Sequence, residues 1–328
     1  MRPSEAENYR HPHTSEGLNP IVEEEEGGRI VTGRLLGGDE EYGIVNGIPR
    51  FCPRENYSSS FGYQWQFWSE TQLDSRGRWG TVSESRLFGE SEWPRNLEGE
   101  RILEAGCGMG RFTEILATTG AKICSFDYSA AVEANFHNNG HHENVCFAQA
   151  DIYAPPYEPE SFDKVLCIGV LQHCPSPKRA FLSLTRFVKP GGEIFVDNYL
   201  LSWKSLFLGK YYLRPVTRLL SAKTLHRFVK FHVGWVFPFT GWLQRHIGRP
   251  GRSLSCVLAM PDYRGVFDVD EETARELSRL DAFDALAPAY DRPKTFGAVR
   301  KWFDEAGLVD VVLKPGSNGI AARGRKPA

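Results

Sequence analysis

Short apolar segments alternate with helix-length segments from Arg101 onward, and this alternation restricts the fold more than any other feature of the chain. Most of the apolar segments are bounded by Gly, Asp or Pro, a pattern typical of βα units with parallel strands. The alternation stops after Asn198 and resumes near residue 295. Strands are expected at 101–105, 121–127, 144–150, 162–168, 192–198, 308–313 and 318–323, and helices at 110–119, 129–138 (with Ser129 as N-cap), 177–188 and 295–306. The sequence therefore predicts an α/β fold with a doubly wound, mostly parallel sheet of seven strands.

Composition divides the chain into three parts. Residues 1–60 are polar and glycine-rich and are expected to form a small β-rich module without metal. Residues 61–98 are rich in aromatic side chains, and they are expected to form helices that act either as a lid or as packing against the core. Residues 99–328 are expected to be the main domain, interrupted by a helical insertion at 199–290.

Overall composition excludes several classes of protein. The net charge is −2, which argues against a generally nucleic-acid-binding surface. The seven cysteines form no CxxC pair and are expected to be reduced, packed thiols in a cytoplasmic protein, with no zinc site. The first residues contain no apolar signal segment, and no apolar run is long enough to span a membrane.

The segment ILEAGCGMGR, from Ile102 to Arg111, carries the strongest chemical signal. A strand leads into glycines at 106, 108 and 110, where a tight turn lets a ligand approach the backbone and the N-terminus of the next helix. The spacing is GxGxG rather than the GxGxxG of nicotinamide-binding folds. Glu104 precedes the glycines, and its charge suits a cationic amino acid better than a pyrophosphate.

Two further strands end in acidic residues. The second ends in Asp127, which is followed by Tyr128, at the point of the sheet where a carboxylate can accept both hydroxyls of a ribose. The third is followed by Asp151 and Ile152, a carboxylate and an apolar side chain that can bracket an adenine ring. Together with the glycine-rich turn, these residues predict a nucleoside-binding site.

The ordered set of motifs from Arg101 to about Tyr199 resembles the core of the Rossmann-like (class I) S-adenosylmethionine-dependent methyltransferases. LEAGCGMG is similar to their first motif, FDYS to the segment with the ribose-binding acid, and QADI to the pair that contacts adenine. SFDKVLCIGVLQHCPSP and VKPGGEIFVDNY resemble the fourth and fifth strands with their turns. KTFGAVRKWFDEAGLVDVVLKPG resembles the closing helix and the strand before the reversed final strand of that family.

The resemblance implies S-adenosylmethionine (SAM) as cofactor and a role for each matching residue. Glu104 and the backbone of Gly106, Gly108 and Gly169 would hold the methionine part. Asp127, with Tyr128 beside it, would hold the ribose, and Asp151 with Ile152 the adenine; Gly110 completes the glycine turn.

Candidates for acid–base chemistry follow the strands. His173 comes after the fourth strand and is expected at the mouth of the cofactor pocket, either as a general base or substrate contact, or as a hydrogen-bonded residue that orders the loop. Tyr199 and Tyr290 are further candidates, with packing as the alternative.

The segment YGIVNGIPRF, residues 42–51, resembles the end of a small zinc-ribbon-like module that precedes the catalytic domain in many bacterial methyltransferases. Such ribbons use CxxC pairs, whereas this chain has no cysteine before Cys52. A module of this kind would have to be held by packing, with strands expected near 29–35 and 42–45.

The stretch 199–261 has no Asp or Glu, although the whole chain is nearly neutral. Its cations are interleaved with aromatic residues, which suits an anionic or lipid-linked substrate, an anionic membrane surface, or RNA phosphates. The alternative is a cap whose cations face water or pair with acids elsewhere. The ten cations are Lys204, Lys210, Arg214, Arg218, Lys223, Arg227, Lys230, Arg245, Arg249 and Arg252.

These observations lead to one expected function and two alternatives. The chain is expected to be a SAM-dependent methyltransferase acting on a small molecule, most simply on oxygen, with a possible peripheral membrane contact through 199–261. A methyltransferase acting on RNA is disfavoured, because no RNA-reading motif is recognisable. The other alternative is a SAM-binding scaffold subunit without turnover.

Overall fold

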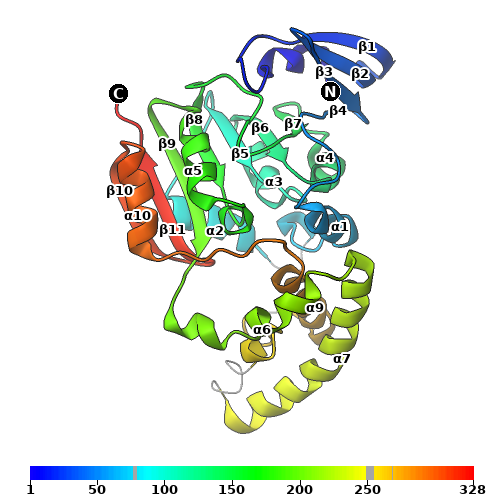
Figure 1. The fold of residues 1–328 in the computed structure, drawn as a ribbon, viewed down its shortest axis with the longest axis vertical. Coiled ribbons are helices and arrows are strands. Elements are labelled where there is room, and N and C mark those ends of the chain that lie inside the picture. Colours follow the sequence, from blue (N-terminus) through cyan, green and yellow to red (C-terminus); the bar gives the residue numbers. More distant parts are fainter. Residues whose placement is uncertain (77–79, 249–254, 268) are drawn as a thin grey trace.

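The structure is a computed structural model that describes residues 1–76, 80–248, 255–267 and 269–328. Arg249 and Arg252, two of the ten cations of the insertion, lie outside the described residues. A seven-stranded sheet forms the centre of the molecule, with helices on both of its faces, a small second sheet at one end and a helical part at the other (Figure 1).

The seven-stranded sheet has the order β10-β11-β9-β8-β5-β6-β7. Its five strands from β9 to β7 are parallel, while β11 runs antiparallel to both β9 and β10. This arrangement confirms the predicted fold class, including the reversed final strand. The strands are β5 (Arg101–Ala105), β6 (Lys122–Asp127), β7 (Val145–Gln149), β8 (Phe162–Cys167), β9 (Val188–Tyr199), β10 (Val309–Gly316) and β11 (Gly319–Arg325).

Alternating strand residues build two apolar layers, one on each face of the sheet. Leu103 of β5 belongs to one of these apolar layers, and its neighbour Ile102 belongs to the layer on the opposite face of the sheet. The first layer is covered by α5 (Pro177–Thr185) and α10 (Phe296–Glu305), and the second by α2 (Val82–Ser91), α3 (Arg111–Ala117) and α4 (Ala131–Asn139). The predicted N-cap of α4 was wrong by one residue, since the cap position is Ala130. Ser129 nevertheless accepts a hydrogen bond from the backbone N–H of Ala131 at 3.1 Å.

The N-terminal residues form an antiparallel four-stranded sheet beside β7 (Figure 1). The two predicted strands are present, and β1 adds a strand over the acidic run that the sequence pattern did not indicate. The Tyr9 hydroxyl donates to the carbonyl of Phe147 at 2.8 Å, and the ammonium of Met1 donates to the carbonyls of Ile30 and Gly47. The Tyr9 hydrogen bond ties the N-terminal residues to β7 at the edge of the large sheet, whereas the Met1 contacts hold the N-terminal residues together. The elements of this N-terminal part are η1 (Pro3–Asn8), β1 (Asn19–Glu26), β2 (Arg29–Gly37), β3 (Glu40–Val45) and β4 (Ile48–Pro49).

The segment between β9 and α10 is largely helical and folds below the carboxyl ends of the strands (Figure 1). Its apolar core joins residues of α7 and α9 to Trp68, which follows α1. On α7 the buried residues recur at helical spacing, at 225, 229, 233 and 237. The elements of the segment are η4 (Trp203–Phe207), α6 (Gly209–Thr217), α7 (Ala222–Ile247) and α9 (Glu271–Leu286). Three elements precede β9 in the chain: α1 (Ser59–Phe67), η2 (Asp74–Arg76) and η3 (Leu171–His173).

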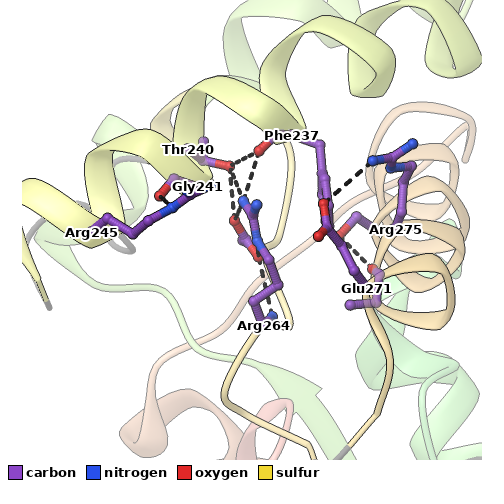
Figure 2. A network of polar contacts seen from close by, with 10 residues as sticks. Phe237, Thr240, Gly241, Arg245, Arg264, Glu271 and Arg275 are labelled. Carbon is purple, nitrogen blue, oxygen red and sulfur yellow. Dashed lines mark hydrogen bonds and ion pairs between the residues drawn. The ribbon is translucent and has the colours of Figure 1, made fainter.

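Arg264 fastens the loop before α9 to the inner side of α7, as Figure 2 shows. Its guanidinium donates to the Phe237 carbonyl at 2.7 Å and to the Thr240 hydroxyl at 2.9 Å, and it forms an ion pair with Asp262. A Cβ at Gly241 would lie 2.1 Å from this guanidinium, so a larger residue there would displace the Arg264 side chain from this position. The network holds one wall of the cavity described next.

Candidate active site

A cavity of about 1000 Å³ lies at the carboxyl ends of the parallel strands, between the sheet and the helical segment. This is the edge of a doubly wound sheet at which ligands bind. Eight of the twelve residues expected in a site line it, and they come from the glycine turn, the ends of β6 and β9, and the loops after β7 and β8: Gly106, Gly108, Asp127, Tyr128, Ile152, Gly169, His173 and Tyr199. Four do not line it: Glu104, Gly110, Asp151 and Tyr290.

Asp127 joins the glycine turn to the end of β6. One carboxylate oxygen accepts the backbone N–H of Gly108 at 2.9 Å, and the other accepts the N–H and the hydroxyl of Ser129 at 2.8 and 2.7 Å. Burial raises the pKa of Asp127, while these hydrogen bonds work against the rise. Oδ2, which accepts only the Gly108 N–H, keeps acceptor capacity, whereas Oδ1 already accepts two hydrogen bonds. Asp127 can therefore accept a further hydroxyl group from a ligand in the cavity through Oδ2.

Glu104 lies behind the glycine turn and does not line the cavity. Its Oε2 accepts hydrogen bonds from the hydroxyls of Thr113 at 2.5 Å and Ser125 at 2.8 Å. Its Oε1 is buried and has no hydrogen-bond partner among the described residues. Burial raises the pKa of Glu104 to about 7, and the nearby charge of Asp127 adds to the rise. A buried carboxyl with an unused acceptor fits a positively charged group bound close by.

Gly169, in the loop between β8 and η3, keeps part of the cavity open. Its φ is +78°, and the nearest atom to an added Cβ would be the Asn318 Nδ2 at 3.8 Å. Its N–H donates to Asp197 at 2.6 Å, and Asp197 also binds Arg86 at 2.6 Å. A side chain at 169 would be strained and would occupy space that a ligand needs. This cradle and the free oxygen of Glu104 fit SAM.

Tyr128 and Ile152 mark the part of the cavity expected to hold adenine. The Tyr128 ring contacts the Tyr57 ring with centroids 4.9 Å apart, and both residues line the cavity. Asp151 is outside the lining, and one of its oxygens accepts the N–H of Tyr153 at 3.0 Å. Burial raises the pKa of Asp151. Asp151 is thus a loop-ordering residue in this structure, with its neighbour Ile152 facing the cavity.

His173 is buried beside the cavity. Its Nδ1 lies 3.0 Å from the carbonyl oxygen of Tyr290, and because a carbonyl only accepts, Nδ1 must carry the proton. Burial lowers the pKa of His173, so the ring is neutral at pH 7 and Nε2 keeps its lone pair. The ring packs between Phe61 and Tyr199, with centroids 5.0 and 5.5 Å away. Tyr290 thus contributes its carbonyl here, while its side chain stays outside the cavity lining.

A polar wall of the cavity was missed by the sequence reasoning. It consists of Arg86 from α2, Arg111 from α3, Tyr263, and Asp281 and Asp284 from α9. Burial raises the pKa of Asp281 to about 6 and lowers that of Arg111 to about 10. These residues stand in three distant parts of the chain, and no spacing between them signals a common site.

Arg111 differs from Arg86 because its hydrogen bonds go to neutral side chains. It donates to the hydroxyl of Ser83 at 2.7 Å and to the side-chain oxygen of Gln72 at 3.2 Å. Within the part of the chain that the structure describes, no carboxylate lies within 4 Å of its guanidinium, and desolvation lowers its pKa although the side chain is only partly buried. A half-buried guanidinium without an ion-pair partner favours a ligand that brings negative charge or strong acceptors.

The described residues contain no group of three or more His, Cys, Asp or Glu arranged to hold a metal ion. No helix in the described ranges is both long and apolar enough to cross a membrane. The topology and the site together define a Rossmann-like fold with a nucleoside pocket of the class I methyltransferase type.

Comparison with known proteins gives the family. A family model described as a methyltransferase domain matches residues 103–196. The chain is 36% identical over 106 residues to a ubiquinone biosynthesis O-methyltransferase of Pseudomonas fluorescens strain Pf0-1, covering 31% of this chain and 46% of that protein. It is 31% identical over 165 residues to the protein of the same name from Aromatoleum aromaticum, covering 47% of this chain and 70% of that one. The chain spans about half the length of the first curated relatives that it matches.

Solved structures share the general arrangement at a low level of similarity. Human N-acetylserotonin methyltransferase in complex with SAM has a TM-score of 0.44 and 16% identity, covering 84% of this chain and 62% of that one. The chain belongs to the class I SAM-dependent methyltransferase family. The expected cofactor, S-adenosylmethionine, is thereby confirmed.

Gly110→Ala is expected to destabilise the fold without changing the cofactor site. Gly110 has φ +92°, and an added Cβ would lie 2.1 Å from Asn135 Oδ1 and 2.2 Å from Asn139 Nδ2. The free energy of unfolding should fall by about 2–4 kcal/mol, measured by chemical denaturation. Gly120→Ala is a matched control with a similar φ of +84° and looser surroundings, nearest atom 3.2 Å. Normal stability combined with lost SAM affinity in the Gly110 variant would instead make it a ligand-contacting residue.

Binding of SAM is expected to release a proton from Glu104. Its raised pKa means that the folded chain binds a proton more tightly than the unfolded chain, so Glu104 lowers the free energy of unfolding as pH rises from about 4.5 to about 7. A ligand ammonium nearby reverses the shift, and SAM affinity should rise roughly tenfold from pH 5.5 to 7.5. Titration calorimetry in buffers of different ionisation enthalpy measures the proton. Glu104→Gln should flatten the profile, and an unchanged profile in that variant would exclude Glu104 as its source.

Proposed function

We propose that this protein transfers a methyl group from SAM to an oxygen of a small-molecule acceptor. The observation that carries the proposal is one continuous cavity. At one end it is lined by the glycine turn and Asp127, and at the other by polar side chains of α9 and of the helical segment. The volume suits a cofactor together with an acceptor.

The residues of the first end support the cofactor roles expected for them. Asp127 would accept the ribose hydroxyls, and Tyr128 with Ile152 would lie along the adenine. The backbone at Gly106, Gly108 and Gly169 would hold the methionine part, with Glu104 acting through its charge. Gly110 and Asp151 would act by shaping the turn and the loop.

When bound, SAM supplies a methyl group already activated on a sulfonium, so that one S–C bond breaks and one O–C bond forms. The chain must then hold the acceptor oxygen in line with that bond at near-attack distance. His173 Nε2 would take the hydroxyl proton, since the histidine is neutral and its other nitrogen is held by the Tyr290 carbonyl. The Tyr199 hydroxyl, which donates to Asp284 at 3.4 Å, would orient the acceptor.

The acceptor would carry negative charge or several acceptor oxygens, as in a phosphorylated, glycan or lipid-linked compound. Arg111 supports this class because, in the described part of the chain, no carboxylate lies within 4 Å of its guanidinium and its hydrogen bonds go to the neutral side chains of Ser83 and Gln72. Arg86 is less available, since Asp197 already binds it at 2.6 Å. Asp281 and Asp284 would accept hydrogen bonds from acceptor hydroxyls.

Two measurements test the proposed function. Titration with SAM and with its demethylated product tests the pocket, and absence of binding by either would contradict the cofactor roles. Incubation with methyl-labelled SAM and an extract of the cells that make the protein should place label in the small-molecule or lipid fraction. Label in RNA would favour the alternative of an RNA methyltransferase, and binding without any transfer would favour a scaffold subunit.

The parts outside the cavity have proposed roles as well. Residues 1–60 would be a metal-free counterpart of the zinc-ribbon-like module, held through contacts such as Tyr9 to Phe147. Residues 61–98 would close over the cofactor, since Phe61 and Trp65 line the cavity. Residues 99–328 would form the catalytic domain, whose 199–290 segment would supply the acceptor wall and, through 199–261, a peripheral membrane contact in the cytoplasm.

A further inference from the structure

Helix α7 presents a row of large aromatic side chains to solvent. Phe231, Trp235, Phe239 and Trp242 are 67%, 71%, 49% and 52% exposed. They recur three or four residues apart, which places them on one side of the helix. The opposite side is buried against α9 and the loop fastened by Arg264 (Figure 2). The outward row is therefore not part of the core of this chain.

Such exposure is confined to a small part of the molecule. Among the described residues, seven Trp and Phe side chains rank as exposed, and six of them lie between 203 and 242. Phe67 is the seventh, and its ring contacts Trp68 and His226. Exposed apolar residues scattered singly need no explanation, whereas a row of four along one helix indicates a contact surface.

Basic residues run beside the aromatic row. Lys223, Arg227, Lys230 and Arg245 are exposed on α7, and at 100° per residue they lie on the side of the outward face next to Phe231 and Trp242. In the described ranges none of the four forms an ion pair within 4 Å. The face is thus half aromatic and half cationic, and no acidic residue stands between 199 and 261.

Two other cations of the segment, Lys210 and Arg214, differ from these four because they bind groups of the chain itself. Lys210 pairs with Asp291 at 2.6 Å, and Arg214 donates to the carbonyls of Ala285 and Pro288. Both residues are turned toward the interior. The remaining described cations of the segment keep their charge uncompensated on the surface, where it is available to a partner.

A second copy of this chain is a poor occupant for the face. Contact between two such faces would bring cations together without a single acid to pair them. An anionic bilayer matches both halves of the face, because tryptophan and phenylalanine lie favourably at the headgroup level and cations bind anionic headgroups. At 26 residues α7 can lie along such a surface for about 39 Å.

We propose that α7 is a docking helix that binds the surface of an anionic lipid bilayer, with its aromatic row inserted at headgroup depth. The proposal deepens the membrane contact proposed above and does not depend on methyl transfer. Membrane binding would hold the cavity, whose lining includes Leu208 and Met260 of the same segment, close to a lipid-linked acceptor.

The test is sedimentation of the full-length protein with phosphatidylcholine vesicles, with or without roughly 30% phosphatidylglycerol. The protein should sediment only with the anionic vesicles and should be released at high salt. Trp235→Ala with Trp242→Ala should weaken binding at least about tenfold, and Lys223→Gln with Arg227→Gln and Lys230→Gln about a hundredfold. Val309→Ala with Val312→Ala, which changes exposed apolar residues of β10, is the matched control and should bind normally.

Three results would overturn the proposal: no binding of the unaltered protein to either vesicle, equal binding to both, or normal binding by the tryptophan variant. A concentration-dependent dimer abolished by that variant, without vesicle binding, would instead assign the face to a second copy. Thermal unfolding and SAM titration should be unchanged in all variants, because the altered side chains are exposed and lie outside the cavity. Failure of docking is thus distinguishable from failure of the cofactor pocket.

Discussion

Asp127→Asn is expected to weaken SAM binding by about a hundredfold, equivalent to about 2.7 kcal/mol. The substitution removes the charge that would accept the ribose hydroxyls. It also replaces one of two acceptor oxygens by an NH₂ group, which would face either the N–H of Gly108 or the N–H of Ser129. The affinity for SAM and for its demethylated product, measured by titration calorimetry, should fall together, because both carry the same ribose.

A matched control is Asp163→Asn at the other end of the sheet. Asp163 also accepts a backbone N–H, that of Arg101 at 2.8 Å, and pairs with Lys189, but it does not line the cavity. It should lose some stability and keep its SAM affinity. If both variants lost affinity in proportion to stability, Asp127 would serve only the turn.

The central sheet could be predicted because each of its strands is specified locally. A strand such as β5 or β8 is a short buried run with residues for both apolar layers, and its end is marked by Gly or Asp. Glycine and acid positions at the strand ends are likewise local features. That is why Gly106, Gly108, Asp127 and Ile152 were placed in the cavity from the sequence alone.

The polar wall of the cavity could not be predicted, because tertiary packing creates it. Arg86 is on α2, Arg111 on α3, and Asp281 on α9, and they meet only after the helical segment folds over the strand ends. The burial of Glu104 could not be predicted either. Glu104 is close to the glycine turn in sequence, yet its side chain lies behind the turn and accepts hydrogen bonds from Thr113 and Ser125.

The basic segment, residues 199–261, shows what composition alone can predict and what it cannot. Absence of acids between 199 and 261 could not distinguish cations that hold the fold from cations that face a partner. The groups that bind Lys210 and Arg214 come from beyond the segment: Asp291 pairs with Lys210, and the backbone carbonyls of Ala285 and Pro288 accept from Arg214. The aromatic residues divide in the same way, with Phe237 buried and Trp235 exposed on one helix.

His173→Asn is expected to lower the rate of methyl transfer at saturating SAM by about a hundredfold or more. The asparagine Nδ2 can replace the histidine Nδ1 and still donate to the Tyr290 carbonyl, which now lies 3.0 Å away. It offers no basic nitrogen to the cavity, so the loop stays ordered while proton removal is lost. The measurement is the rate of label transfer from methyl-labelled SAM into the acceptor fraction, with SAM affinity measured in parallel.

The two roles considered for His173 then give opposite results. If it is the base, SAM affinity stays near that of the unaltered protein, and the acid side of the pH–rate profile disappears. That side exists because the rate falls once His173 is protonated, below the pKa that burial has lowered. His232→Gln is the matched control, since His232 also donates to a carbonyl, that of Leu258 at 2.7 Å, outside the cavity lining. A normal rate in His173→Asn would leave the histidine as a loop-ordering residue and would make Asp281 and Asp284, the acidic groups of the polar wall, the next candidates for the base.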